Sequence, residues 1–235
     1  MDLQQLYSYS RRAIEDFDMI QDDDHICIGI SGGKDSLALL YALAGLRNFF
    51  PKKFKISAIT VDLTNGEQDF SPIKSLCDEL GVDYHVSVTD ITNIVFNQRG
   101  ETNPCSLCAK MRKGSLNDLA KELGCNKIAY AHHKDDFIET MLLSLIYEGR
   151  FHCFKPVTYL DRTELTLIRP LMYVPEMDVI GFANKNPLPV MKNPCPIDGH
   201  TKREYVKGLL RQLTKENPGV KDRFFTAILN GGFDA

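Results

Sequence analysis

Two groups of residues in this chain of 235 have the types and the spacing for chemistry: a glycine-rich loop and a pair of cysteines. The loop, Ser31-Gly32-Gly33-Lys34-Asp35-Ser36, follows a short apolar run and precedes a segment rich in Leu and Ala. Glycines let the backbone approach a ligand closely, and the start of a helix presents free N–H groups to anions. Lys34 adds a positive charge, and Ser31 and Ser36 add hydroxyl donors. The loop is therefore predicted to bind phosphates, although its spacing excludes a Walker A loop and a dinucleotide fingerprint.

Cys105 and Cys108 form the pair, a Cys-x-x-Cys at the start of a predicted helix. A helix N-terminus favours the thiolate, and two thiolates at this spacing can bind one metal centre. Cys195, which lies between two prolines, is the third candidate ligand. Three cysteines fit a [4Fe–4S] cluster in which one iron lacks a protein thiolate and is open to sulfide, whereas electron-transfer clusters normally have four. The alternative is Zn²⁺ held by these cysteines and His200 in a Cys₃His site.

The composition places these groups in an ordinary globular chain. It is 43% hydrophobic and 25% charged, and its length allows a core without disulfide staples. Seven cysteines in such a chain favour metal binding or catalysis. The sequence has no apolar run of about 18 residues and no signal-like N-terminus, so we expect a cytoplasmic protein without a membrane segment. The four other cysteines are interpreted as small hydrophobes: Cys27, Cys77, Cys125 and Cys153.

Alternating strands and helices predict a doubly wound α/β fold with a mostly parallel sheet. Apolar runs predict strands at residues 26–30, 55–62, 83–88 and 127–131, and an edge strand at 166–170. Helical periodicity predicts helices at residues 3–17, 36–49, 71–80, 103–123, 135–147, 175–184 and 202–215. We expect an N-terminal helix in residues 1–20, the main domain in residues 21–200, and a basic helical extension of that domain in residues 201–235.

Polar residues follow two of these strands, at the sheet edge where doubly wound folds bind ligands. Asp62 ends the second strand, and it either contacts the adenine and ribose of a nucleotide or caps a loop. His132 and His133 follow the fourth strand. His132 is a candidate ATP contact, with a structural role as the alternative. Of the next two carboxylates, Asp135 and Asp136, we expect one to help hold Mg²⁺ and the other to be the N-cap of the following helix.

Positive charge gathers near the C-terminus although the net charge is −3. Residues 202–223 carry seven Lys or Arg residues against three acids. This segment is either an ordinary solvated face or a surface for RNA phosphates, in which case salt should weaken binding steeply. The candidate RNA-binding residues are Arg112, Lys113, Lys202, Arg203, Lys207 and Arg211.

The glycine loop resembles the SGGxDS motif, or PP-loop, of the ATP-pyrophosphatase superfamily. Members of that superfamily cleave ATP to AMP and pyrophosphate while they adenylate a substrate. Further motifs resemble, in order and over nearly the whole chain, the TtcA family of tRNA 2-thiocytidine synthases. They are Pro104-Cys105-Ser106-Leu107-Cys108-Ala109, Arg112-Lys113-Gly114, Ala131-His132-His133-Lys134-Asp135-Asp136, Ile168-Arg169-Pro170-Leu171 and Asn193-Pro194-Cys195-Pro196.

The resemblance implies an ATP site at residues 31–36, a [4Fe–4S] cluster on Cys105, Cys108 and Cys195, and sulfur insertion at C2 of a cytidine in the tRNA anticodon loop. Transfer of AMP to a base carbonyl oxygen would make that oxygen a good leaving group, and sulfide or a persulfide would then replace it. Loop bases are suitable targets because they can be splayed into a pocket. The expected partners are tRNA and a sulfur donor, such as a cysteine desulfurase or free sulfide. A homodimer is compatible with the resemblance.

Two other classes of function remain open from the residues alone. The chain could be a redox-sensing RNA-binding module that has the fold without catalysis, and the intact glycine loop argues against this. It could also be an ATP-dependent ligase or amidase of the same superfamily. Such enzymes usually carry a glutaminase or ammonia-channel partner, and nothing in the sequence resembles one.

Overall fold

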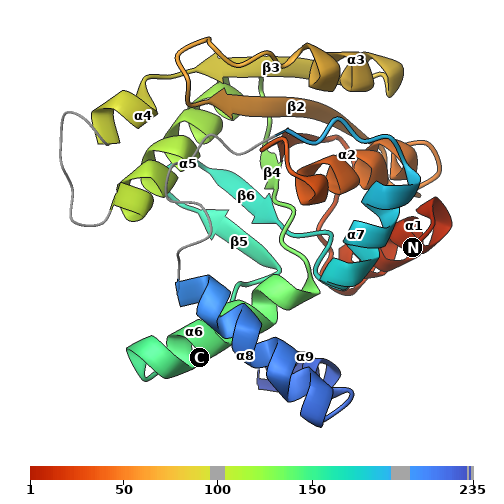
Figure 1. Cartoon of the computed structure of the whole chain (residues 1–235). Helices are drawn as coiled ribbons and strands as arrows, with labels where there is room; N and C mark the ends of the chain where they lie inside the picture. Colours follow the sequence, from red (N-terminus) through yellow and green to blue (C-terminus); the bar gives the residue numbers. More distant parts are fainter. Residues whose placement is uncertain (96–103, 192–201, 232, 234–235) are drawn as a thin grey trace.

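The computed structural model describes the chain except for residues 96–103, 192–201, 232 and 234–235 (Figure 1). The strands are β1 (Asp24–Gly29), β2 (Phe54–Asp62), β3 (Asp83–Val88), β4 (Lys127–Ala129), β5 (Val157–Leu160) and β6 (Leu165–Ile168). The helices are α1 (Leu3–Asp16), α2 (Lys34–Leu46), α3 (Ser71–Glu79), α4 (Ile91–Asn93), α5 (Pro104–Glu122), α6 (Lys134–Glu148), α7 (Glu176–Lys185), α8 (Lys202–Glu216) and α9 (Val220–Gly231).

The strands of the described residues form one sheet in the order β3-β2-β1-β4-β6-β5. Neighbouring strands are parallel except β5 and β6, which are antiparallel. The chain runs outward from β1 to β3, and then returns to place β4 on the other side of β1. The predicted doubly wound, mostly parallel fold is therefore confirmed. In such sheets the ligand crevice forms where the strand order reverses, at the carboxyl ends of the strands. Here that point lies between β1 and β4.

Helices cover the sheet on both faces, and β1 supplies side chains to both layers. Ile26 and Ile28 belong to the larger core, which includes residues of α1, α2, α3 and α6 to α9. Cys27 points to the opposite face and joins a smaller core with Leu116 and Ala120 of α5. Alternate residues of a strand face opposite sides of a sheet, so an unbroken apolar run is what a strand buried on both faces requires.

The expectation of an edge strand at residues 166–170 was wrong in its position. The strand there, β6, lies inside the sheet between β4 and β5. The edge on this side of the sheet is β5, which pairs with β6 through a hairpin turn that includes Glu164 at φ +54°. β5 has only four residues, and Tyr159 is exposed. A strand of four residues is too short to show a repeating pattern by which the sequence could reveal it.

The C-terminal helices complete the larger core rather than stand apart from it. α8 and α9 both contact α6, on the side of the molecule away from β3 (Figure 1). Val206 and Leu210 of α8 and Phe225 and Ile228 of α9 are buried there. α9 was not recognised as a separate helix in the sequence. None of the helices in the described ranges is both long and apolar enough to cross a membrane.

Candidate active site

The glycine loop joins β1 to α2, as predicted, and two serines brace it. Gly33 is the N-cap of α2 without a side-chain cap, and Gly32 has φ +78°. Ser36 Oγ donates to the carbonyl oxygen of Gly33 at 2.9 Å and accepts from the backbone N–H of Ser31 at 3.2 Å. The ammonium of Lys34 lies 2.9 Å from a carboxylate oxygen of Asp35. The loop is thus held in shape at a helix N-terminus, the end that attracts anions.

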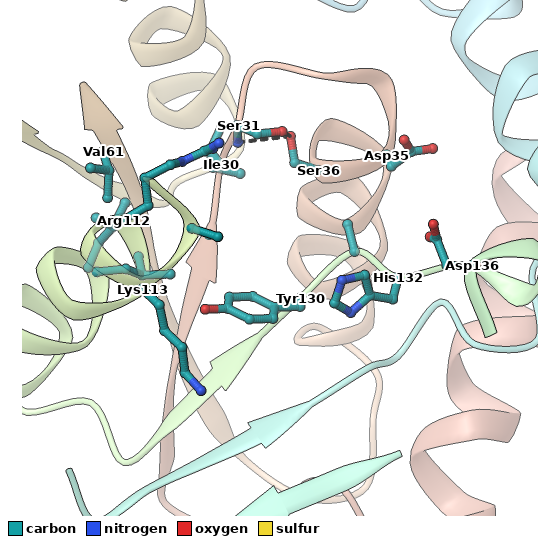
Figure 2. Close-up of a pocket in the computed structure, with 15 residues that line it drawn as sticks. Ile30, Ser31, Asp35, Ser36, Val61, Arg112, Lys113, Tyr130, His132 and Asp136 are labelled. Atoms are coloured by element: carbon teal, nitrogen blue, oxygen red, sulfur yellow. Dashed lines mark hydrogen bonds between the residues drawn. The ribbon is translucent and has the colours of Figure 1, made fainter. Parts of the chain in front are cut away.

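A cavity of about 480 Å³ lies between β1 and β4, at the carboxyl ends of the strands. Its lining comes from the glycine loop and the start of α2, the end of β2, one face of α5, and the segment from β4 into α6. Figure 2 shows Arg112 and Lys113 of α5 at one end of the cavity and Asp35 and Asp136 at the other. The volume is within the range of pockets for small ligands, and the opposed charges suit a polar one.

The cysteine pair lies at the start of α5, the helix whose side chains form one wall of the cavity. Cys105 and Cys108 are in the first turns of α5; Cys105 is exposed and Cys108 is partly buried. Positions four apart share a helix face, and Ala109 and Arg112, four residues after each cysteine, line the cavity. α5 also packs closely on the end of β1, since a Cβ at Gly29 would come within 3.2 Å of the Leu116 side chain.

The third predicted ligand and its zinc alternative, Cys195 and His200, lie outside the described residues. Within the part of the chain that the structure describes, no three Cys, His, Asp or Glu side chains gather in a way that could hold a metal ion. The cluster on three cysteines therefore stays a prediction.

The two neighbouring aspartates have different environments, and neither is the N-cap of α6. His133 is the N-cap: its Nδ1 accepts from Asp136 N–H at 3.3 Å, and the Asp136 carboxylate accepts from His133 N–H at 2.9 Å. The expectation that an aspartate is the N-cap was wrong, because a ring nitrogen can accept the same bond. Asp136 lines the cavity. Asp135 is buried outside it and accepts from the backbone N–H of Glu176 at 2.7 Å.

A lysine completes the surroundings of Asp135. Burial alone would raise the pKa of this carboxyl, but the bonds from Glu176 N–H and Lys221 outweigh burial and hold the pKa below its ordinary value. Asp135 is therefore an ionised structural group that ties α6 to α7 and α9.

Asp62 caps the loop after β2, which is one of its two predicted roles. Its carboxylate is buried and accepts from Thr64 N–H at 2.8 Å, Thr64 Oγ1 at 2.7 Å and Gly66 N–H at 2.6 Å. Both oxygens are used in this turn, and the cavity is lined instead by its neighbour Val61. Asp62 therefore shapes the loop after β2.

His132 lines the cavity, and behind it lies an arginine that sequence reasoning did not single out for a role. Arg169 Nε donates to His132 Nδ1 at 3.1 Å, and the His132 ring stacks on Phe154 with ring centroids 4.3 Å apart. Burial, helped by the Arg169 charge, lowers the pKa of His132 from 6.5 to about 3. The signals in the sequence were the place of Arg169, directly after the apolar run of β6, and its membership of the Ile168-Arg169-Pro170-Leu171 motif.

Comparison with known proteins identifies the family. A family model described as a PP-loop domain matches residues 5–215. The chain is 42% identical over 224 residues to a tRNA-cytidine(32) 2-sulfurtransferase of Geobacter sulfurreducens. The aligned region covers 93% of this chain and 86% of the relative. A protein of the same name from Citrifermentans bemidjiense is 38% identical, covering 93% of this chain and 87% of the relative. The chain belongs to the tRNA-cytidine(32) 2-sulfurtransferase family of PP-loop proteins.

Solved structures agree with this membership. The U34-tRNA thiolase NcsA of Methanococcus maripaludis, determined with its [4Fe–4S] cluster, is 25% identical with a TM-score of 0.79, over 95% of this chain and 76% of that one. An NH₃-dependent NAD synthetase of Campylobacter jejuni is 17% identical with a TM-score of 0.51, over 98% of this chain and 93% of that one. The second likeness shows a shared fold alone.

Two of the predicted RNA-binding cations of this sulfurtransferase-family chain make internal ion pairs. Arg203 contacts the buried Glu139 at 2.8 Å and Asp136 at 3.3 Å, and Lys207 contacts Glu176 at 3.2 Å. These contacts fasten α8 to the elements around the cavity. The other two candidates on α8, Lys202 and Arg211, are exposed.

We predict that Gly32→Ala weakens ATP binding about tenfold, because a left-handed residue with a Cβ costs roughly 1–2 kcal/mol. The new Cβ would also lie 3.0 Å from Met191 Cβ, in a segment whose backbone N–H bonds to Gly32 O at 2.9 Å. Gly66→Ala is the matched control, since Gly66 has φ +88° and no atom within 4 Å of the new Cβ. Calorimetric titration with ATP measures the effect, and equal dissociation constants for the two variants would contradict it.

We predict that acid destabilises this PP-loop protein partly through His132. The folded ring takes up a proton only near pH 3, whereas the unfolded ring does so near pH 6.5. The stability from the neutral ring is thus present above pH 6.5 and is lost as pH falls toward 3. Between pH 7 and pH 5 the free energy of unfolding should fall by about 2 kcal/mol more in the wild type than in His132→Gln. Urea unfolding at both pH values tests this, and equal losses would refute it.

Proposed function

We propose that this chain is an ATP-dependent tRNA sulfurtransferase that replaces the C2 oxygen of cytidine 32 with sulfur. One observation carries the proposal: the phosphate-binding type of loop and the helix that begins with Cys105 and Cys108 are two walls of the same cavity. This arrangement would let a site that activates an oxygen with ATP act beside a sulfur-carrying centre. The names of the relatives supply the tRNA and the target base.

In the first step, the carbonyl oxygen at C2 attacks the α-phosphorus of ATP, and pyrophosphate leaves. The N–H groups at the start of α2, together with Ser31, Lys34 and Ser36, would bind the phosphates and stabilise the charge that develops on pyrophosphate. Arg112 and Lys113, on the opposite wall, would neutralise the remaining phosphate charge or contact the RNA backbone. In the second step, sulfur attacks C2, the bond between C2 and its former carbonyl oxygen breaks, and AMP leaves with that oxygen.

The cavity also fits Mg²⁺, whose usual ligands are carboxylate oxygens and phosphates. Asp35 and Asp136 both line the cavity, and both lie within 4 Å of the His133 ring, which lies between them. We assign Asp136 rather than Asp135 to the ion, because Asp135 is engaged with Glu176 N–H and Lys221 outside the cavity. When bound, Mg²⁺ would neutralise phosphate charge as pyrophosphate leaves.

Cys105, Cys108 and Cys195 fit an iron–sulfur cluster by donor chemistry. Cys105 and Cys108 occupy a helix start, where thiolates are favoured. When bound, a [4Fe–4S] cluster on these three cysteines would supply one iron without a protein thiolate, as a place for sulfide. Zn²⁺ on the same cysteines and His200 is the alternative, with a persulfide as sulfur carrier.

The tRNA would approach along cations of α8 and α5. Lys202 and Arg211 on α8 are exposed, and Arg112 and Lys113 line the cavity on α5. Neutralising phosphates with such cations makes affinity fall steeply with salt. Arg203 and Lys207 would instead act indirectly, because they tie α8 to Glu139 and Glu176.

Reconstitution of the purified protein tests the proposal. The protein is prepared without oxygen, supplied with iron and sulfide, and incubated with unmodified tRNA, ATP and Mg²⁺. We expect 2-thiocytidine and AMP in equal amounts. AMP without a thionucleoside, or no nucleotide cleavage despite tRNA binding, would overturn the proposal, and the latter result would favour the non-catalytic RNA-binding module. Full activity in a colourless, iron-free protein would overturn the cluster in favour of zinc.

A further inference from the structure

The His132 ring is held in one orientation from three directions. Its Nδ1 accepts the Nε–H of Arg169 at 3.1 Å. One face stacks on Phe154 at an interplanar angle of 14°, and Tyr130 approaches edge-on with centroids 5.7 Å apart. Flipping the ring would break the bond to Arg169, so the two nitrogens have separate and fixed roles.

The bond from Arg169 determines which nitrogen carries the proton. A guanidinium only donates, so Nδ1 must present its lone pair and the proton of the neutral ring must be on Nε2. Burial keeps the ring neutral at physiological pH because it lowers the pKa of His132 to about 3. Among the described residues, Nε2 has no hydrogen-bond partner. The fully buried side-chain atoms that lack a partner do not include Nε2. His132 therefore offers an N–H donor on the wall of the cavity.

Arg169 gives this donor an electrostatic bias. Arg169 is 7% exposed as a residue, and its other contacts are uncharged: Lys155 O, Thr158 Oγ1 at 3.4 Å, and the face of Phe154 at 4.9 Å. No carboxylate of the described residues pairs with it. A buried cation that no carboxylate of the described residues neutralises, directly behind the ring, makes the Nε2 proton a stronger donor and favours an anionic oxygen in front of it.

We propose that His132 is a neutral hydrogen-bond donor to the α-phosphoryl oxygen of ATP, and that Arg169 is the positioning residue that fixes its tautomer. The inference rests on the proposed function and assigns a role within it. As the base oxygen forms its bond to the α-phosphorus and the bond to pyrophosphate breaks, negative charge stays on the non-bridging oxygens. His132 stabilises that charge without giving up its proton, and pyrophosphate leaves with the bonding electron pair.

The tautomer is tested without any activity measurement. Long-range ¹H–¹⁵N spectra of protein labelled in its histidine rings separate Nε2–H from Nδ1–H forms, and His132→Gln identifies the His132 signal by its loss. We expect an Nε2–H ring that does not titrate between pH 5 and pH 8. In Arg169→Gln, whose amide can donate or accept, we expect a mixture of tautomers. A wild-type ring that is protonated on Nδ1, or that titrates in this range, would overturn the proposal whatever reaction the protein catalyses.

The role of the donor is tested with a matched pair of variants. Gln at position 132 places an amide N–H near the site of Nε2, whereas Asn accepts from Arg169 at the site of Nδ1 and leaves no donor at Nε2. In single-turnover AMP formation we expect His132→Asn to be about 100-fold slow and His132→Gln to stay within about tenfold of wild type. The affinity for tRNA should not change. Equal rates for the two variants, or a loss confined to tRNA binding, would overturn the role. A wild type without AMP formation would refute the proposed function and leave the tautomer result standing.

Discussion

Cys105→Ser is expected to remove the bound iron and to lower the rate of thiolation by about 1,000-fold or more, as loss of a central catalytic group does. Serine keeps the start of α5 intact, but its hydroxyl is not a thiolate and is a poor ligand for iron. Because Ala109 and Arg112 still line the cavity, ATP affinity should change little. Iron analysis, visible absorbance and single-turnover thiolation measure the three effects on one preparation.

Cys125→Ala is the matched control for this experiment. Cys125 is buried in the smaller core, and burial raises the pKa of its thiol to about 11, so it is an unreactive thiol near the same helix. Its loss should cost about 1 kcal/mol of stability and leave iron content and thiolation intact. An active, iron-loaded Cys105→Ser protein would show that the cysteine pair is not the sulfur-carrying centre. A loss of iron in Cys125→Ala would show that the assay reports folding instead.

Asp136→Asn is expected to slow AMP formation about 100-fold and to raise the Mg²⁺ concentration needed for half-maximal rate. The amide keeps an oxygen for the N–H of His133, so the start of α6 should survive. The substitution removes the negative charge of Asp136 from the cavity wall, and Arg203 keeps its ion pair with Glu139. The measurement is the rate of AMP formation across a Mg²⁺ titration.

Asp222→Asn is the control that separates this effect from a general loss of charge. Asp222 pairs with Lys134 in the first turn of α6, but its side chain is 74% exposed and it does not line the cavity. Exposed ion pairs contribute at most about 1 kcal/mol, so rate and Mg²⁺ dependence should match the wild type. If Asp136→Asn behaved like Asp222→Asn, Asp136 would not be the carboxylate that helps hold Mg²⁺.

The sequence predicted the features that depend on local pattern. β3 begins and ends at the predicted residues 83 and 88, and β1, β2 and β4 were recognised because strands buried on two faces need apolar runs. The glycine loop was placed correctly between β1 and α2, since its glycines mark a turn that few other sequences can make. Because strands and helices alternate along the chain, a loop that directly follows a parallel strand lies at the carboxyl edge of the sheet.

Two of the features that the sequence did not predict depend on partners distant along the chain. Arg203 is indistinguishable in sequence from an RNA-binding cation, and only folding brings Glu139 to it. The tautomer of His132 is set by Arg169, 37 positions away. His133 as an N-cap was missed because residue preferences at that position favour Ser, Thr, Asp and Asn.

The most direct test of the central claim, that ATP activation and sulfur delivery meet in one cavity to thiolate cytidine, is nucleoside analysis of tRNA from cells that lack this protein. We predict that 2-thiocytidine disappears, returns when the wild-type chain is expressed, and stays absent when Cys105→Ser or Asp136→Asn is expressed. Wild-type levels of 2-thiocytidine in the deletion strain, or its restoration by Cys105→Ser, would contradict that claim.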